Sequence, residues 1–354
     1  MRHTRHYIFL ALSLLMLYSC NEKVEQSKLR SISFGSQAEG STESKSMGDG
    51  IVGSTTENMR SKPFGIYGHY SNAEGQKFVK GTNDVFNTSE AMSVAHNGSS
   101  WEYSPLAYWR FNDYYRFRAY HPYSGSAFTV LPASSVDLIS IDYKVVNGNE
   151  DLMVAFWKGQ ATEEVIKDRV PMVFKHCLSG LKINIGLTDD SRTDNITELY
   201  IKGLTPNGTM LYTHENPEGS GEGINYDTEV LKWLASTYDS ETEFYKWKGS
   251  KPKPIPQNVT AADYSQAVPV FDGDEHMVFA IPQTCSGAKG ETKVYFKTKK
   301  GGAAIQSVTL PTTDWLPGHI YTYTLLMAPT SKIDVLISIK PWEGVEINED
   351  IHIL

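Results

Sequence analysis

Cysteine is scarce in this chain of 354 residues, which contains only three cysteines, Cys20, Cys177 and Cys285. So few cysteines exclude the framework of several disulfides that holds small secreted domains together. Cys177 and Cys285 lie in apolar, strand-like surroundings, which favours two buried thiols, although a disulfide between them is compatible with an exported protein. The fold must therefore depend on a hydrophobic core.

The common signatures of enzymes are also missing. The chain has no G-x-S-x-G, H-E-x-x-H or C-x-x-C sequence, no P-loop and no dinucleotide-binding fingerprint. The histidines are scattered without the spacing of metal ligands, and we expect them on strand surfaces or in loops: His69, His96, His121, His176, His214, His276 and His319. The sequence predicts no catalytic residue, no cofactor and no metal site.

Two acidic stretches need a separate explanation. The run from Asp272 to Glu275 offers carboxylates, the oxygen ligands that Ca²⁺ prefers, but a solvated hairpin turn explains it more simply. The stretch from Asn147 to Asp151 has the composition of a turn as well.

Basic clusters are lacking too. The formal net charge is −8, and no stripe of lysine or arginine gathers along the chain, which excludes nucleic acid as an expected partner. A hydrophobic content of 40% with 21% charged residues is typical of a globular protein rather than a disordered one.

The first residues have the pattern of an export signal. Arg2 and Arg5 precede an uncharged apolar run, Tyr7–Leu17, which is too short to span a bilayer as a helix. Leu17-Tyr18-Ser19-Cys20 then resembles a lipobox, so we expect cleavage before Cys20 and lipid attachment to its thiol. An ordinary secretory signal with an incidental cysteine is the alternative. No second apolar run has spanning length, so the lipid is the expected membrane anchor.

Short alternating apolar runs, separated by Gly, Asn, Asp, Ser and Pro, fill most of the chain. The runs we expect to be strands are 32–34, 64–70, 115–120, 139–146, 152–157, 181–185, 198–201, 277–281, 293–296, 306–310, 319–326 and 333–339. Many short strands without interleaved helices predict an all-β fold of antiparallel β-sandwiches. We expect a signal peptide and tether over 1–27, an N-terminal sandwich domain over 28–168 and a C-terminal one over 169–354.

Three stretches are predicted to depart from this pattern. Thr228–Ser236 has a capping threonine and apolar residues at helical spacing, so we expect a short helix. Gly35–Arg60 is almost free of apolar residues and is not expected to contribute to a core. Gly249–Gln257 contains K-P-K-P-I-P and is expected to form an extended, polyproline-like loop.

Aromatic residues are dense in one part of the first half: Trp101, Tyr103, Tyr108, Trp109, Tyr114 and Tyr115. Such a group could form a platform for carbohydrate, but an aromatic-rich sandwich core explains it more simply.

Several motifs, taken in order, resemble the fimbrillin family of the Bacteroidetes, which includes type V pilins and fimbrillin-like lipoproteins. The residues that carry the resemblance are Phe64–Tyr70, Tyr115–Tyr123, Val173–Ile183, Trp315–Tyr323 and Ile337–Trp342. Val173–Ile183 is similar to the F-x-H-A-L-S-K-L run of the family, with Cys177 and Gly180 as departures. With the lipobox, these motifs span nearly the whole chain.

The resemblance implies two transthyretin-like β-sandwich domains and a lipoprotein route to the outer membrane. It also implies that a trypsin-like protease cuts after a basic residue beyond the first strand. Loss of that strand would open an apolar groove for a strand of the next subunit, and such head-to-tail contacts build filaments.

Carried onto this chain, the resemblance makes Leu29, Ile32 and Phe34 the apolar residues of the displaced strand. The cut would follow Lys45 or Arg60; family cleavage typically follows arginine, whereas Lys45 is at the expected position. The donor strand would be the tail, with Val345, Ile347, Ile351 and Ile353 as its apolar residues. The tail could equally be the last edge strand of its own subunit.

The sequence therefore predicts a non-enzymatic, surface-anchored fimbrillin-like pilus subunit or adhesin. Its expected partners are other pilin subunits, the outer membrane through the lipid, and a receptor on a host or bacterial surface. A surface glycan-binding lipoprotein that does not polymerise is the alternative, and a lipoprotein hydrolase would need a cleft that the sequence does not indicate.

Overall fold

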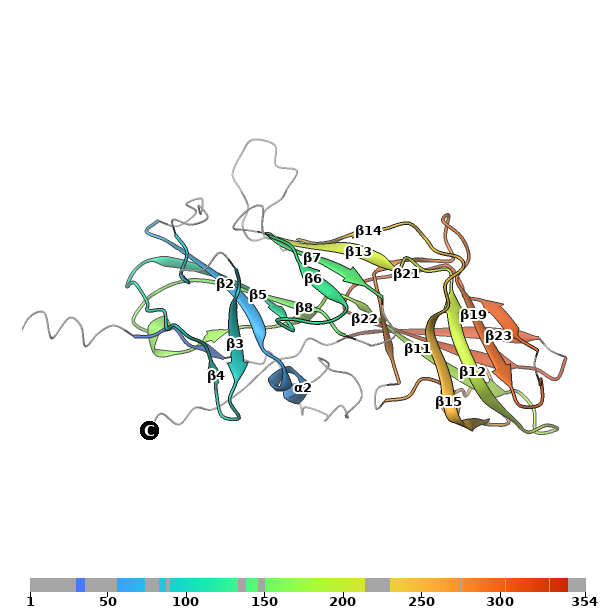
Figure 1. The fold of residues 1–354 in the computed structure, drawn as a ribbon. Helices are drawn as coiled ribbons and strands as arrows, with labels where there is room; N and C mark the ends of the chain where they lie inside the picture. Colours follow the sequence, from blue (N-terminus) through green and yellow to red (C-terminus); the bar gives the residue numbers. More distant parts are fainter. Residues whose placement is uncertain are drawn as a thin grey trace, which may run out of the picture.

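The computed structural model describes residues 30–35, 56–73, 83–86, 90–132, 138–145, 150–213, 230–273, 276–302, 304–330 and 332–342. These residues form an elongated, almost entirely β molecule (Figure 1). The all-β fold class predicted from the sequence is confirmed.

A six-stranded antiparallel sheet forms the centre of the first half. Its order is β10-β8-β5-β2-β3-β4. The strands are β2 (Phe64–Ser71), β3 (Met92–His96), β4 (Trp101–Glu102), β5 (Tyr114–His121), β8 (Met153–Gln160) and β10 (Lys175–His176).

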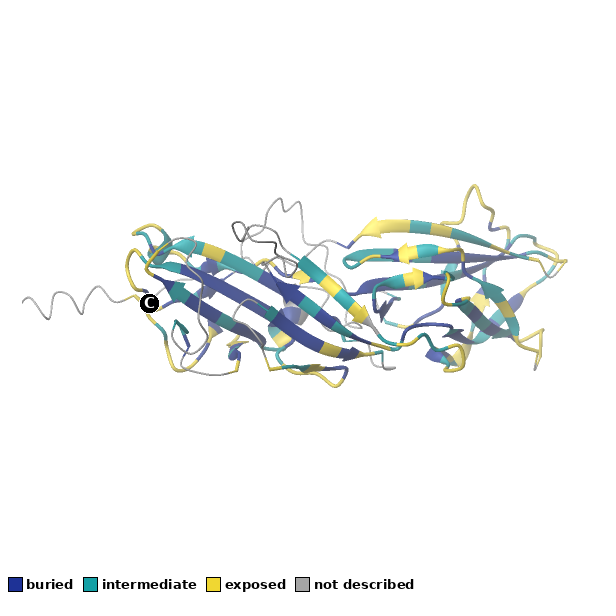
Figure 2. Cartoon of the chain, turned by 90° about the horizontal axis from the view of Figure 1, so that it is seen from above, coloured by how far each residue is buried: buried dark blue, intermediate teal, exposed yellow. Residues whose placement is uncertain are grey.

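This central sheet is covered on both faces, which explains its nearly continuous apolar sequence. In β5, Phe117 and Ala119 belong to one buried cluster, whereas Tyr120 belongs to another on the opposite face. Seven successive residues of β5, from Tyr115 to His121, are buried as a result, as the dark central strands of Figure 2 show.

The cover on one face contains the first described residues. It comprises β1 (Phe34–Gly35), the short helix α2 (Thr56–Ser61), β9 (Val170–Pro171) and the segment between β4 and β5. We call the buried residues on this face the N-terminal core. They include Ile32, Phe34, Met59, Phe64 and Phe117.

The other face packs against a four-stranded sheet of order β14-β13-β7-β6. Its strands are β6 (Phe128–Val130), β7 (Leu138–Lys144), β13 (Asn207–Thr213) and β14 (Val230–Ala235). Antiparallel pairing of β7 with β13 joins strands from both sides of residue 168 in one sheet. The proposed division into 28–168 and 169–354 stays a prediction.

Two further sheets enclose the core of the second half. One is β16-β11-β22-β23, with β17 also paired to β11, and the other is β15-β12-β19-β20. The strands are β11 (Ser179–Leu187), β12 (Asp194–Lys202), β15 (Phe244–Ile255), β16 (Val268–Pro269), β17 (Val278–Ala280), β19 (Lys293–Thr298), β20 (Gln306–Thr309), β22 (His319–Met327) and β23 (Ile333–Pro341). A separate pair, β18 (Gln283–Cys285) and β21 (Thr313–Trp315), and a 3₁₀ turn, η1 (Val165–Lys167), complete the elements.

Three sequence-based predictions of local structure are wrong. Val230–Ala235 is β14, not a helix, because pairing with β13 places Leu231 and Trp233 alternately against the core. Gly249–Ile255 continues β15 instead of forming a free loop; its prolines are tolerated because β15 is an edge strand. Within Gly35–Arg60, Met59 of α2 is completely buried, so this stretch does contribute to the core.

Buried histidines are a further correction. His69, His121 and His176 lie on strands, but with exposed fractions of 6%, 0% and 3% they are not on a surface. Two of them face a carboxylate inside the protein: the Nδ1 atom of His69 lies 3.0 Å from a carboxylate oxygen of Asp84. The Nδ1 atom of His176 lies 2.6 Å from a carboxylate oxygen of Asp151, and both side chains are fully buried.

Candidate functional site: the groove filled by the first strand

The first described residues, 30–35, fill a groove in the N-terminal core, and we call them the first strand. Ile32 and Phe34 point into this core and are each 1% exposed. The Phe34 ring contacts four other aromatic rings, with the nearest centroid, that of Phe117, 5.3 Å away. Burial of two large apolar side chains stabilises the protein by about 1.5–3 kcal/mol each.

One side of the first strand pairs with the segment between β4 and β5. The amide of Ile32 donates to the carbonyl of Ala107 at 2.8 Å, and the amide of Trp109 donates to the carbonyl of Arg30 at 3.0 Å. The hydroxyl of Tyr103 also donates to the carbonyl of Ile32, at 2.8 Å. Burial raises the pKa of Tyr103 to about 12, so this hydroxyl keeps its proton at neutral pH.

The other side pairs with β9 in parallel. The amides of Val170 and Met172 donate to the carbonyls of Ser33 and Gly35, both at 2.9 Å. The side chain of Arg169 packs against Gly35, where an added Cβ would lie 2.6 Å from its Cδ atom. The first strand thus fills the gap between β9 and the segment between β4 and β5, two described edges that do not pair with each other.

Two of the three residues predicted for the displaced strand, Ile32 and Phe34, therefore occupy this groove. Leu29 lies outside the described residues, as do Cys20, Lys45 and the four tail residues Val345, Ile347, Ile351 and Ile353. The described residues therefore include the filled groove, but neither the expected cleavage site Lys45 nor the tail that would replace the first strand.

Arg60 lies in the last turn of α2 and is half-buried beside the completely buried Met59. A protease binds its substrate in an extended conformation, so a cut after Arg60 would require α2 to unfold.

The aromatic group of the first half belongs mostly to the core. Trp101, Tyr103, Trp109 and Tyr115 are buried and interlock edge to face, with Trp109 and Tyr115 centroids 4.6 Å apart at 77°. Only Tyr108 of the six residues is exposed, at 49%. The arrangement does not present a coplanar row of rings for carbohydrate.

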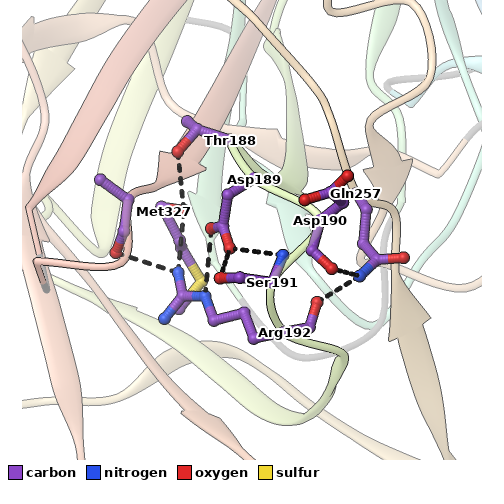
Figure 3. Close-up of polar contacts among 8 residues, drawn as sticks. Thr188, Asp189, Asp190, Ser191, Arg192, Gln257 and Met327 are labelled. Atoms are coloured by element: carbon purple, nitrogen blue, oxygen red, sulfur yellow. Dashed lines mark hydrogen bonds and ion pairs between the residues drawn. The ribbon is translucent and has the colours of Figure 1, made fainter.

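The polar clusters that are described have structural explanations. In the turn after β11, Arg192 donates to the carbonyls of Met327 and Ala328 at 2.8 and 3.0 Å and pairs with Asp189 (Figure 3). Asp272 accepts from Trp247 at 2.7 Å and pairs with Lys253 at 2.9 Å; Asp274 and Glu275 lie outside the described residues.

Three other properties bear on the predicted class. Cys177 and Cys285 are buried in different core clusters and are not bonded to each other. Among the described residues, no group of three or more His, Cys, Asp or Glu side chains is placed to hold a metal ion. No helix in the same part of the chain is long and apolar enough to cross a membrane.

Fold and site together define an all-β protein whose N-terminal core is completed by a separate first strand. The family model described as fimbrillin-like matches residues 53–342, and the chain belongs to this family. The match begins after the first strand and ends at Trp342, so the displaced strand and the tail lie outside it. No curated protein matches the chain.

A solved fimbrial structure shares this fold. A fimbrial protein from Bacteroides vulgatus is 18% identical in sequence and superposes with a TM-score of 0.58. The match covers 89% of this chain and 100% of the Bacteroides vulgatus protein. A candidate cell adhesion protein from Bacteroides ovatus is 14% identical, with a TM-score of 0.47. That match covers 91% of this chain and 98% of the Bacteroides ovatus protein.

Proposed function

We propose that this chain is a non-enzymatic subunit of a cell-surface fimbria, or an adhesin built from the same parts. It assembles by donor-strand exchange after a protease removes its first strand, and Cys20 anchors it to the outer membrane before processing. The observation that supports this proposal is the first strand itself. Its two buried apolar side chains are held by a few backbone hydrogen bonds between two edges that have no other strand partner among the described residues. A sheet edge and an apolar groove left open are costly until another strand fills them.

Lys45 is the cleavage site that we favour. It lies after the first strand and before α2, whereas Arg60 is part of α2 beside buried Met59. The tail supplies the replacement strand, and two of its apolar residues, drawn from Val345, Ile347, Ile351 and Ile353, take the places of Ile32 and Phe34.

Limited trypsin digestion of the chain lacking its leader tests this proposal. We expect one early cut after Lys45, loss of the first strand in the intact mass and a ladder of oligomers on an unheated gel. The K45A variant serves as the control and should keep both its first strand and its monomeric state under the same conditions.

If the first strand is removed and the protein stays monomeric, donor-strand exchange between copies is wrong. If the strand stays protected, the protein is an anchor, a tip or a separate adhesin, and binding to oligosaccharides becomes the next measurement.

A further inference from the structure

The segment that borders the first strand exposes three large apolar side chains. Leu106, Tyr108 and Phe111 are 55%, 49% and 55% exposed. In the described part of the chain, no other stretch of this length exposes three such residues. We call these three residues the apolar rim. An exposed group of this kind is typical of a surface that another molecule covers.

The conformation of the segment is held firmly, so this exposure is not a result of a loose loop. The amide of Arg110 donates to the hydroxyl of Tyr115 at 2.6 Å, and its guanidinium lies 4.1 Å from the ring centre of Tyr70. Beneath the rim, Tyr103 and Trp109 already fill the interior. The rim side chains therefore cannot turn inward.

The apolar rim lies next to one end of the first strand. Ser31 pairs with Tyr108 in antiparallel register, and Arg30 accepts from the amide of Trp109. The N-terminal end of the first strand therefore lies at the part of this segment that leads towards Phe111. A donor that replaces the first strand in the same direction, parallel to β9, has to enter the groove at this end.

We propose that the apolar rim is the contact surface for the body of a second copy of this chain, namely the copy whose tail fills the groove. This inference rests on the proposed function and names a second part of the same interface. The contact covers Leu106, Tyr108 and Phe111 with apolar surface of the incoming subunit, next to the point where its tail enters.

The length of the tail supports this occupant. Val345 follows Trp342, the last described residue, by three positions, so at most about 10 Å of extended chain separates the donor strand from its own subunit. Seating the donor thus places the donor's body against the entrance of the groove.

The charges of the tail and of the rim also support a second copy of the chain as the partner. The tail contains Glu343, Glu346, Glu349 and Asp350 and no basic residue other than His352. The exposed Arg110 lies between Tyr108 and Phe111 and offers the opposite charge at the entrance. Complementary charges of this kind orient two surfaces as they approach each other.

The test compares two triple variants of the chain lacking its leader. The rim variant is L106S/Y108S/F111S. The matched control, L234S/Y264S/I305S, removes residues that are 48%, 39% and 51% exposed in the second half. Urea midpoints check that both remain folded. After trypsin treatment, each is assayed for oligomers by size-exclusion chromatography and for binding of a labelled synthetic peptide of residues 343–354.

We expect the rim variant to bind the peptide within about twofold of the wild type, because the groove is intact, but to lose oligomers at least tenfold. The control variant should match the wild type in both assays. Equal oligomer formation by the rim variant would overturn the inference.

Other outcomes separate this inference from the function on which it rests. If the wild type binds the peptide but forms no oligomers, the tail remains the donor strand, but the contact between the bodies of two copies is wrong. If the wild type neither binds the peptide nor forms oligomers, both the proposed function and this inference are wrong. If the rim variant assembles normally but loses binding to phosphatidylglycerol-containing vesicles, the rim is a membrane contact instead.

Discussion

The described residues contain two pairs of parallel strands, and the pairs differ in extent. β1 pairs with β9 at only two positions, in the N-terminal core. β22 pairs with β11 at eight positions and also with β23 on its other side. The short strand is held mainly by its side chains, whereas the long one is held by a continuous hydrogen-bonded ladder. A strand that is to be exchanged needs the first arrangement, because few backbone bonds have to break before a substitute enters.

Removal of the Phe34 ring, the main side-chain contact of the first strand, should give the largest change in stability. Phe34→Ala deletes a buried ring that contacts four others, so we expect the free energy of unfolding of the first half to fall by about 4 kcal/mol. After cleavage, the variant should form oligomers faster than the wild type, because its first strand leaves more easily.

Phe296→Ala, which removes a completely buried ring of β19 in the second half, is the control for this prediction. It should destabilise the protein by a similar amount, measured from the urea midpoint, without faster oligomer formation. Equal acceleration by both variants would mean that general instability, not release of the first strand, sets the rate.

Trp342 tests the junction between the two halves. Its ring stacks on His176 at 3.7 Å and lies 5.2 Å from Phe279, and its amide donates to the carbonyl of Gly318 at 2.7 Å. Trp342→Ala should cost about 3 kcal/mol of stability, and Trp342→Phe clearly less because stacking is partly retained. Thermal unfolding of both variants measures the difference; a cost below about 1 kcal/mol for alanine would show that the stack does not anchor the end of β23.

Acid should weaken the first half through His69 and His121. Burial lowers the pKa of each to about 4; the positive charge of Arg118 adds to the effect at His69, and Asp84 opposes it. Unfolded histidine titrates near 6.5, so between about pH 6.5 and 4 the unfolded state binds more protons and stability falls as the pH falls.

At pH 5 this loss amounts to about 2 kcal/mol for each histidine. His121→Gln should therefore reduce the difference in unfolding free energy between pH 7.5 and pH 5 by about 2 kcal/mol. An unchanged pH dependence in H121Q, from urea unfolding at both pH values, would contradict the assignment.

The polar turn of the second half should give the smallest effect. Arg192→Ala removes two hydrogen bonds to carbonyls at the end of β22 and an ion pair with Asp189, in a side chain that is partly exposed. We expect a loss of about 1 kcal/mol. Lys332→Ala, at an exposed ion pair with Asp334, should change the urea midpoint hardly at all; a larger loss there than at Arg192 would reverse the comparison.

The sequence predicted the strands better than their partners. Runs such as Phe64–Tyr70 and Ile333–Ile339 are strands β2 and β23 within a few residues, because their composition alone favours extended chain. β14 was missed because its apolar residues also fit helical spacing, and only the edge of β13 decides between the two.

The site could be predicted only in part. The family resemblance made Ile32 and Phe34 candidates for the displaced strand, and both side chains are buried. That β9 and the segment around Ala107 form the two edges of the groove could not be predicted. Both edges lie more than seventy residues along the chain from the first strand, so no local sequence pattern shows that they pair with it. The buried His176–Asp151 pair depends on the same kind of long-range contact.

Hydrogen exchange of single amides tests the central claim, that the first strand is separable, most directly. The amides of Val170 and Met172 bond to the first strand, whereas those of Tyr323 and Leu325 lie inside the ladder of β22. In the chain cut after Lys45, we expect Val170 and Met172 to exchange through a local opening, several kcal/mol below the opening free energy of the β22 amides. Equal opening free energies at the four amides would mean that the first strand leaves only when the whole protein unfolds, and would contradict the account.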